Sequence, residues 1–149
     1  MKGDITFERA TAKDIDTFLA LESKAADLKT WGPLSNADGA AREIRENTLY
    51  LIKSNETVVG IAAYRVREKG SIYISNVAVD PAFRRLGIAR LVMEHILDIN
   101  KNARRVELVT HPENEHALRL YVSLGFTIES LRENYFGDGE PRLVLARSG

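Results

Sequence analysis

The sequence contains no cysteine. This absence excludes disulfide bonds, metal sites built on thiolates and a cysteine nucleophile, and it is compatible with a reducing compartment. The sequence also lacks an excess of either charge, because 21 Lys and Arg residues balance 21 Asp and Glu residues. Proteins dedicated to nucleic acids usually carry a basic excess. We therefore expect no nucleic-acid partner, although Arg84 and Arg85 form a local basic spot.

Long apolar runs are also missing. No segment approaches the length needed to span a membrane, and residues 1–10 lack the apolar centre of a signal peptide. We therefore expect a soluble, cytoplasmic protein without a membrane partner. The 149 residues, 44% of them hydrophobic and 28% charged, predict a single domain over 1–149 with one substantial core. Both a monomer and a homodimer are compatible with this composition.

Hydrophobic periodicity and turn residues divide the chain into alternating helices and strands. The predicted order is β-α-α-β-β-β-α-β-α-β-β, which indicates an α/β (α+β) fold with helices on the faces of a mixed sheet. The predicted strands cover residues 4–9, 48–54, 57–68, 71–80, 104–110, 126–134 and 141–147. The predicted helices cover residues 11–25, 37–46, 86–100 and 114–124.

The segment "VAVDPAFRRLGIAR", residues 77–90, joins a strand to an apolar helix. The first backbone N–H groups of a helix have no partners within it, and the helix dipole adds positive potential there. Gly87 and Ala89 leave room for a phosphate to approach these groups, and Arg84 and Arg85 supply further donors. The segment is therefore typical of a pyrophosphate cradle. The alternative is that Gly87 only eases a turn and that the arginines are solvated.

A second segment, "NEHALRLYVSLGF", spans residues 114–126. Asn114, Ala117, Leu118 and Tyr121 recur at helical spacing and therefore share one helix face. Taken alone, Asn114 could simply cap the helix, and Tyr121 could simply fill its apolar face.

Together the two segments resemble the GCN5-related N-acetyltransferase (GNAT) family. Arg84, Gly87 and Ala89 match the family pattern Arg/Gln-x-x-Gly-x-Gly/Ala, and residues 114–126 resemble the second signature. The resemblance runs from about residue 5 to 146 and is most specific over 74–126. It implies a mostly antiparallel sheet of about seven strands, with about four helices on both faces. It also implies that the fourth and fifth strands splay apart, and we expect them to do so beyond Val79.

The same resemblance implies acetyl-coenzyme A as cosubstrate and no metal. The strand at residues 77–79 would pair with the pantetheine amides, and the following loop would bind the diphosphate mainly through backbone N–H groups. Tyr121 would be the catalytic general acid that protonates the departing thiolate. A backbone N–H near Val79 could stabilise the developing oxyanion. The implied cofactor-binding residues are Val77, Ala78, Val79, Arg84, Arg85, Leu86, Gly87, Ile88, Ala89, Arg90 and Asn114.

The resemblance is closest to the subgroup of ribosomal-protein and protein N-terminal alanine acetyltransferases. Its members share features with residues 76–90 and with "LYVSLGF", and their "R-x-NYY" tail resembles "RENYF" at 132–136. Segment 28–47 and this tail would shape the acceptor site. The implied substrate-binding residues are Trp31, Tyr73 and Tyr135.

The sequence departs from the family at the general base. Members of the family carry a glutamate on the fifth or the fourth strand, where this chain has Val109 and Tyr73. Glu107 and His111 flank Val109 on the same strand face, so either of them, or a water molecule, could act instead. His111 has no partner at metal-ligand spacing, and we do not expect it to bind a metal.

These features favour an enzyme that transfers acetyl to a primary amine by direct attack. The acceptor would be a protein or peptide N-terminus, or alternatively a small amine such as a polyamine or an amino-acid derivative. The missing glutamate favours a further alternative, a non-catalytic module that binds coenzyme A.

Overall fold

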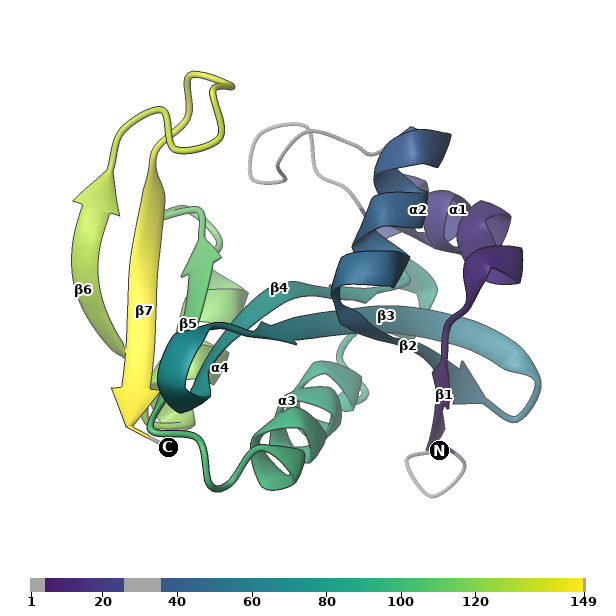
Figure 1. Cartoon of the computed structure of the whole chain (residues 1–149), viewed down its shortest axis with the longest axis horizontal. Coiled ribbons are helices and arrows are strands. Elements are labelled where there is room, and N and C mark those ends of the chain that lie inside the picture. The colour runs from purple at the N-terminus through teal and green to yellow at the C-terminus, as the bar shows by residue number, and fades with distance from the viewer. Residues whose placement is uncertain (1–4, 26–35, 149) are drawn as a thin grey trace.

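The computed structural model describes residues 5–25 and 36–148. Seven strands form one sheet in the order β1-β2-β3-β4-β5-β7-β6 (Figure 1). The strands are β1 (Ile5–Arg9), β2 (Thr48–Ser54), β3 (Thr57–Val66), β4 (Ser71–Val79), β5 (Arg105–Thr110), β6 (Thr127–Arg132) and β7 (Arg142–Ser148).

Helices cover both faces of the sheet. Helices α1 and α2 lie on one face, and α3 and α4 on the other (Figure 1). Their bounds are Ile15–Ala25 for α1, Ala37–Glu46 for α2, Ile88–Ile99 for α3 and Glu115–Ser123 for α4, and short 3-10 turns cover Ala12–Asp14, Glu68–Gly70 and Pro81–Phe83. The predicted α/β class and the predicted order of elements are both confirmed. No helix in the described ranges is long and apolar enough to cross a bilayer.

Each face of the sheet has its own apolar core. Alternate strand residues such as Ile72 and Ile74 pack against α3 residues that include Met93 and Ile96. The opposite face of the sheet packs against α1, where Phe18 is fully buried. Because successive side chains of a strand point to opposite faces, the strands contribute to both cores. The helices of both layers pack on these cores, which fixes their ends beside the sheet.

The fourth and fifth strands are parallel, and they pair only where they begin. Ser71–Tyr73 pairs with Arg105–Glu107, although β4 continues to Val79 and β5 to Thr110. The predicted splay is therefore present, but it starts directly after Tyr73 and not beyond Val79. The edge of β4 from 74 to 79 has no strand partner on this side among the described residues.

A bulge accompanies the splay. Ala63 pairs with Asn76 and Tyr64 with Ile74, so Ser75 is an extra residue in β4. A bulge bends its strand and increases the local twist. This bend turns β4 away from β5.

Candidate active site

The loop between β4 and α3 forms a concave cluster of backbone N–H groups. Gly87 is the N-cap of α3 and has φ 78°, and Arg85 also has a positive φ of 67°. A left-handed residue followed by a helical one directs successive N–H groups toward one point, which creates an anion-binding nest. Glycine adopts this conformation without strain and has no Cβ to obstruct a ligand. The geometry therefore suits a phosphate group at the start of α3.

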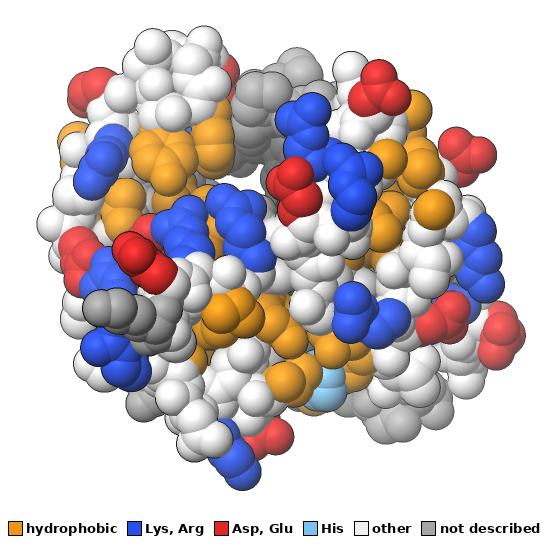
Figure 2. Space-filling model, viewed as in Figure 1, with side chains coloured by type: hydrophobic (Ala, Val, Ile, Leu, Met, Phe, Trp, Pro, Cys, Tyr) orange, Lys and Arg blue, Asp and Glu red, His pale blue; other side chains and the backbone are white. Residues whose placement is uncertain are grey.

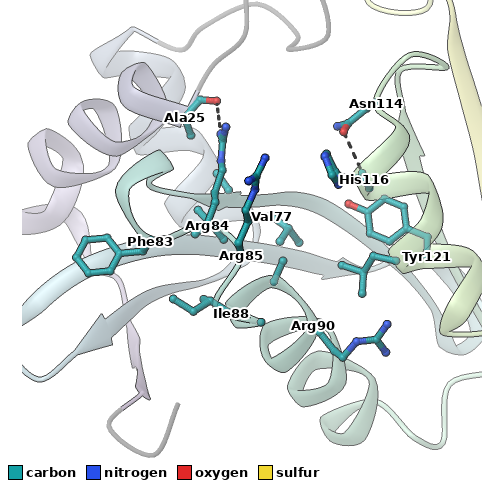
Figure 3. A pocket seen from close by; sticks show the side chains of 16 residues that line it. Ala25, Val77, Phe83, Arg84, Arg85, Ile88, Arg90, Asn114, His116 and Tyr121 are labelled. Atoms are coloured by element: carbon teal, nitrogen blue, oxygen red, sulfur yellow. Dashed lines mark hydrogen bonds between the residues drawn. The ribbon is translucent and has the colours of Figure 1, made fainter. Parts of the chain in front are cut away.

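A cavity of about 540 Å³ extends from this nest along β4 to α4 (Figure 3). Arg84 and Arg85 lie on one side of the cavity, and Asn114, His116 and Tyr121 face them from α4 (Figure 3). The residues that line it are Ala25, Val77, Ala78, Val79, Phe83, Arg84, Arg85, Gly87, Ile88, Ala89, Arg90, Asn114, His116, Ala117, Leu120 and Tyr121.

The cavity brings together almost all of the residues predicted to bind the cofactor. Leu86 is the exception, because its side chain is 38% exposed and it is not part of the lining. Five further residues line the cavity but were not predicted as site residues, namely Ala25, Phe83, His116, Ala117 and Leu120. Ala25 ends α1, and nothing in its local sequence indicates that it reaches the loop after β4.

Arg84 connects the cradle to α1. Its Nη2 donates a hydrogen bond of 3.0 Å to the carbonyl oxygen of Ala25 (Figure 3). Arg90, one turn into α3, donates to the Ser123 hydroxyl at the end of α4 at 2.7 Å. These hydrogen bonds link the cradle to α1 and α3 to α4, and the side chains of Arg84, Arg85 and Arg90 are all exposed.

On α4, Asn114 and Tyr121 both face the cavity. The Asn114 side chain accepts a hydrogen bond of 3.4 Å from the Ala117 N–H, so it does cap the helix. Its amide NH₂ group can still donate to a ligand. Burial raises the pKa of Tyr121 to about 12, so the phenol keeps its proton throughout the neutral range. The hydroxyl is therefore a donor directed into the cavity.

A cluster of aromatic and cationic side chains lies at the start of the splay, on the sheet face that α1 and α2 cover. Tyr73 is 8% exposed, and its ring lies 4.0 Å from the Arg67 guanidinium and 4.9 Å from that of Arg65. Burial, with a smaller contribution from Tyr135, raises the pKa of Tyr73 to about 12. Tyr73 and Tyr135, both predicted to bind substrate, are thus neighbours. Lys and Arg side chains (blue) lie near the middle of the side of the molecule that Figure 2 shows.

The loop between β6 and β7 is held by Arg142, which is 1% exposed. Arg142 forms a 3.0 Å ion pair with Asp138, and its guanidinium lies 5.0 Å from the centre of the Phe136 ring. Phe136 meets Tyr135 edge to face at 4.8 Å. This loop and α2 stand on the same side of the sheet (Figure 1). The buried arginine therefore anchors the β6–β7 loop, which brings Tyr135 close to Tyr73 at the start of the splay.

Glu107, the first alternative for the general base, is engaged in ion pairs. Its carboxylate lies 3.2 Å from Arg67 and 2.8 Å from Arg105. Arg105 also holds Glu129 at 2.6 Å. The carboxylate of Glu107 is thus held between the guanidinium groups of Arg67 and Arg105 and is already engaged.

His111, the second alternative, is buried. It is 1% exposed and sits just after β5. Its Nδ1 accepts the Glu113 N–H at 3.0 Å, and its Nε2 lies 2.7 Å from the Glu140 carboxylate. Both ring nitrogens are thus occupied, and His111 ties β5 to the β6–β7 loop.

Trp31, predicted to bind substrate, lies outside the described residues. The His95 ring of α3 stacks on Phe7 of β1, with ring centroids 3.9 Å apart and an interplanar angle of 4°. His95 is not part of the cavity lining.

Comparison with known proteins connects this arrangement to one group. A profile described as the acetyltransferase (GNAT) family matches residues 15–126. The ribosomal protein bS18-alanine N-acetyltransferase of Salmonella typhimurium is 38% identical over 63 residues, which cover 41% of this chain and 43% of that protein. This chain spans about half of the length of the curated relatives that it matches first.

Solved structures share the fold. The ribosomal-protein-S18-alanine N-acetyltransferase from Escherichia coli superposes with a TM-score of 0.82 at 21% identity, covering 97% of this chain and 93% of that one. Arabidopsis thaliana Naa50 in complex with the bisubstrate analogue CoA-Ac-MVNAL superposes with a TM-score of 0.82 at 23% identity, covering 98% and 99%.

Proposed function

The chain belongs to the acetyltransferase (GNAT) family, and from this we propose that residues 1–149 form one domain that transfers acetyl from acetyl-coenzyme A to a primary amine. The observation that carries the proposal is the cavity. It runs from the nest before α3, past the unpaired edge of β4, to the Tyr121 hydroxyl. These are a site for a diphosphate, a site for an amide-containing arm and a proton donor, in the order in which the cosubstrate presents its parts.

The residues present fit the cosubstrate. The N–H groups around Gly87 would bind the diphosphate, with Arg85 as an additional cation. The free edge at 77–79 would pair with the amides of the pantetheine arm, as an added strand does. The Asn114 amide would hold the same arm from α4.

The proposed chemistry follows from the same residues. The thioester of the cosubstrate supplies an activated acetyl group and a thiolate leaving group. Tyr121 would donate its proton to that sulfur, and its raised pKa keeps the proton in place until the sulfur becomes basic. A backbone N–H near Val79 would stabilise the negative charge on the carbonyl oxygen.

We propose a protein or peptide N-terminus as the acceptor. Support comes from the relatives, which are named as alanine N-acetyltransferases of a ribosomal protein. Further support comes from Tyr73 and Tyr135, which lie close together where β4 and β5 stop pairing, beside a loop anchored by Arg142. An extended chain end would approach this place with its amine first.

The test is an acceptor screen that measures thiol release from acetyl-coenzyme A. It compares peptides with a free N-terminal alanine, the same peptides blocked at the amine, and polyamines. Gly87→Glu serves as the cradle variant and should abolish cosubstrate binding in calorimetry through bulk and charge. Turnover with free peptides and none with blocked ones supports the proposal. Turnover with polyamines alone would show that the acceptor is a small amine and not a peptide. Tight binding of coenzyme A without any turnover would show that the chain is a non-catalytic coenzyme A-binding module.

A further inference from the structure

The β4 bulge carries a polar contact with α2 on the sheet face opposite α3. The hydroxyl oxygen of Ser75 lies 3.4 Å from Glu43 Oε1 and 3.4 Å from Asn47 Oδ1. Ser75 comes two residues after Tyr73, where the pairing of β4 with β5 ends. This contact therefore lies beside the start of the splay, where the proposed acceptor would bind.

Glu43 is held in place by the end of α2. The Asn47 N–H and the Asn47 Nδ2 both donate to the Glu43 carbonyl oxygen, at 3.1 and 2.9 Å. Asn47 is buried, whereas Glu43 is half-buried and so keeps access to solvent. The helix end thus fixes the backbone of Glu43 and leaves its carboxylate accessible.

The surroundings of Glu43 make it a better proton acceptor than an ordinary surface glutamate. Burial raises its pKa above the usual value, and the negative charges of Glu22 and Glu46 act in the same direction. The Ser75 hydrogen bond and the positive charge of Arg65 lower the pKa and only partly offset the burial.

Other proton acceptors near the splay are already engaged. Glu107 lies between two arginines, both ring nitrogens of His111 are occupied, and burial keeps Tyr73 protonated. In contrast, Glu43 has no ion-pair partner within 4.0 Å among the residues that the structure describes. Its contact with Ser75 is a single long hydrogen bond.

We propose that Glu43 binds the ammonium group of the acceptor and takes its proton, in place of the glutamate that the fourth and fifth strands lack. This inference rests on the proposed acetyl transfer. One N–H bond of the ammonium breaks and one O–H bond forms on Glu43. The freed lone pair attacks the thioester carbonyl carbon, the C–S bond breaks, and sulfur leaves with its electron pair. The proton that Tyr121 gives to sulfur is replaced by the one that the new amide nitrogen loses, and Glu43 returns its proton to solvent.

The contacts of Ser75 accommodate both charge states of Glu43. When Glu43 is charged, the hydroxyl can donate to its carboxylate. When Glu43 is protonated, the hydroxyl can donate to Asn47 Oδ1 and accept from the carboxylic acid. The Ser75 hydroxyl thus keeps a partner in either state, so proton transfer requires no rearrangement of the backbone.

The experiment compares Glu43→Gln with Asp38→Asn, which neutralises an exposed carboxylate on the same helix that is not among the groups shifting the pKa of Glu43. The probe is a synthetic peptide with a free N-terminal alanine, and kcat/KM is measured from pH 6 to 9.5. An α-amino group has a pKa of about 7.7–8.0, so roughly a tenth of the peptide is already neutral at pH 7. We therefore expect Glu43→Gln to lower kcat/KM about tenfold or more at pH 7, and the deficit to disappear above about pH 9.

Three controls separate this role from a structural one. Coenzyme A affinity, measured by calorimetry, should be the same in both variants, which also confirms that they are folded. Glu43→Asp keeps a carboxylate and should recover part of the rate. Three outcomes would each overturn the inference: a Glu43→Gln deficit that is equal at every pH, equal losses for Glu43→Gln and Glu43→Asp, or equal rates for Glu43→Gln and Asp38→Asn. A wild-type chain that transfers nothing to any amine would instead refute the proposed function, and this inference with it.

Discussion

Strands β3 and β4 approach each other closely beside the cavity, at Gly60 of β3. A Cβ atom built on Gly60 would lie 2.8 Å from the backbone oxygen of Ala78, where ordinary contact begins at 3.4 Å. Gly60→Ala therefore requires β3 and β4 to separate by about 0.6 Å, because the obstacle is backbone and cannot rotate away. Overpacking of this kind costs about 1–3 kcal/mol. For a chain of this size that corresponds to a fall in Tm of about 2–12 °C.

The same displacement reaches the proposed site, because Ala78 lines the cavity. We expect the affinity of Gly60→Ala for acetyl-coenzyme A to fall about three- to tenfold, which is about 0.7–1.4 kcal/mol. Calorimetry measures the affinity, and a thermal melt without ligand measures the stability.

Gly137→Ala is the matched control. Gly137 has φ 81° in the β6–β7 loop, and no described atom lies within 4 Å of the position that a Cβ would take, so alanine there adds backbone strain but no clash. It should lower the Tm and leave the affinity for acetyl-coenzyme A unchanged. If Gly60→Ala melts like the wild type and binds the cosubstrate equally well, then the strand spacing does not control the site and the reasoning is refuted.

Three more predictions concern single side chains. Tyr121→Phe should lower kcat by about 10²-fold or more while the acetyl-coenzyme A affinity stays within twofold, and unchanged turnover in steady-state kinetics would remove the phenol from its role. Glu107→Gln should keep the pH 7 rate within about threefold, since its carboxylate serves ion pairs, and a loss of 10²-fold would make it the base. Burial raises the pKa of Tyr73 and of Tyr121 to about 12 in the folded chain, whereas free phenols ionise near pH 10. Denaturant melts should therefore show stability falling as pH rises from about 10 to 12, and the double Phe variant should show a smaller fall.

The elements of the fold could be predicted from sequence because each carries a local signal. The period-two alternation at 48–54 and 71–80, the helical spacing at 114–124 and the glycine of the cradle all act within a few residues. The cradle and the α4 face are themselves such segments, so most of the cavity lining could be named in advance.

The acid–base groups could not be predicted, because their states depend on distant residues. Glu107 is paired with Arg67, 40 positions away, and His111 with Glu140, 29 positions away. The importance of Glu43 depends on the placement of α2 over the β4 bulge, which no local pattern encodes. The predicted start of the splay was wrong for the same reason, since it depends on which residues of two distant strands pair.

Strands β4 and β5 share only three residue pairs among the described strands, so the sheet consists of two parts, β1–β4 and β5–β7–β6, with a short connection. A coenzyme lying along the free edge of β4 would supply hydrogen bonds that β5 does not provide. The two parts of the sheet would then form one continuous layer only while the coenzyme is bound. By mass action, occupancy then protects the folded chain against unfolding and proteolysis. The persistence of the protein in a cell would consequently follow the supply of its own acetyl donor.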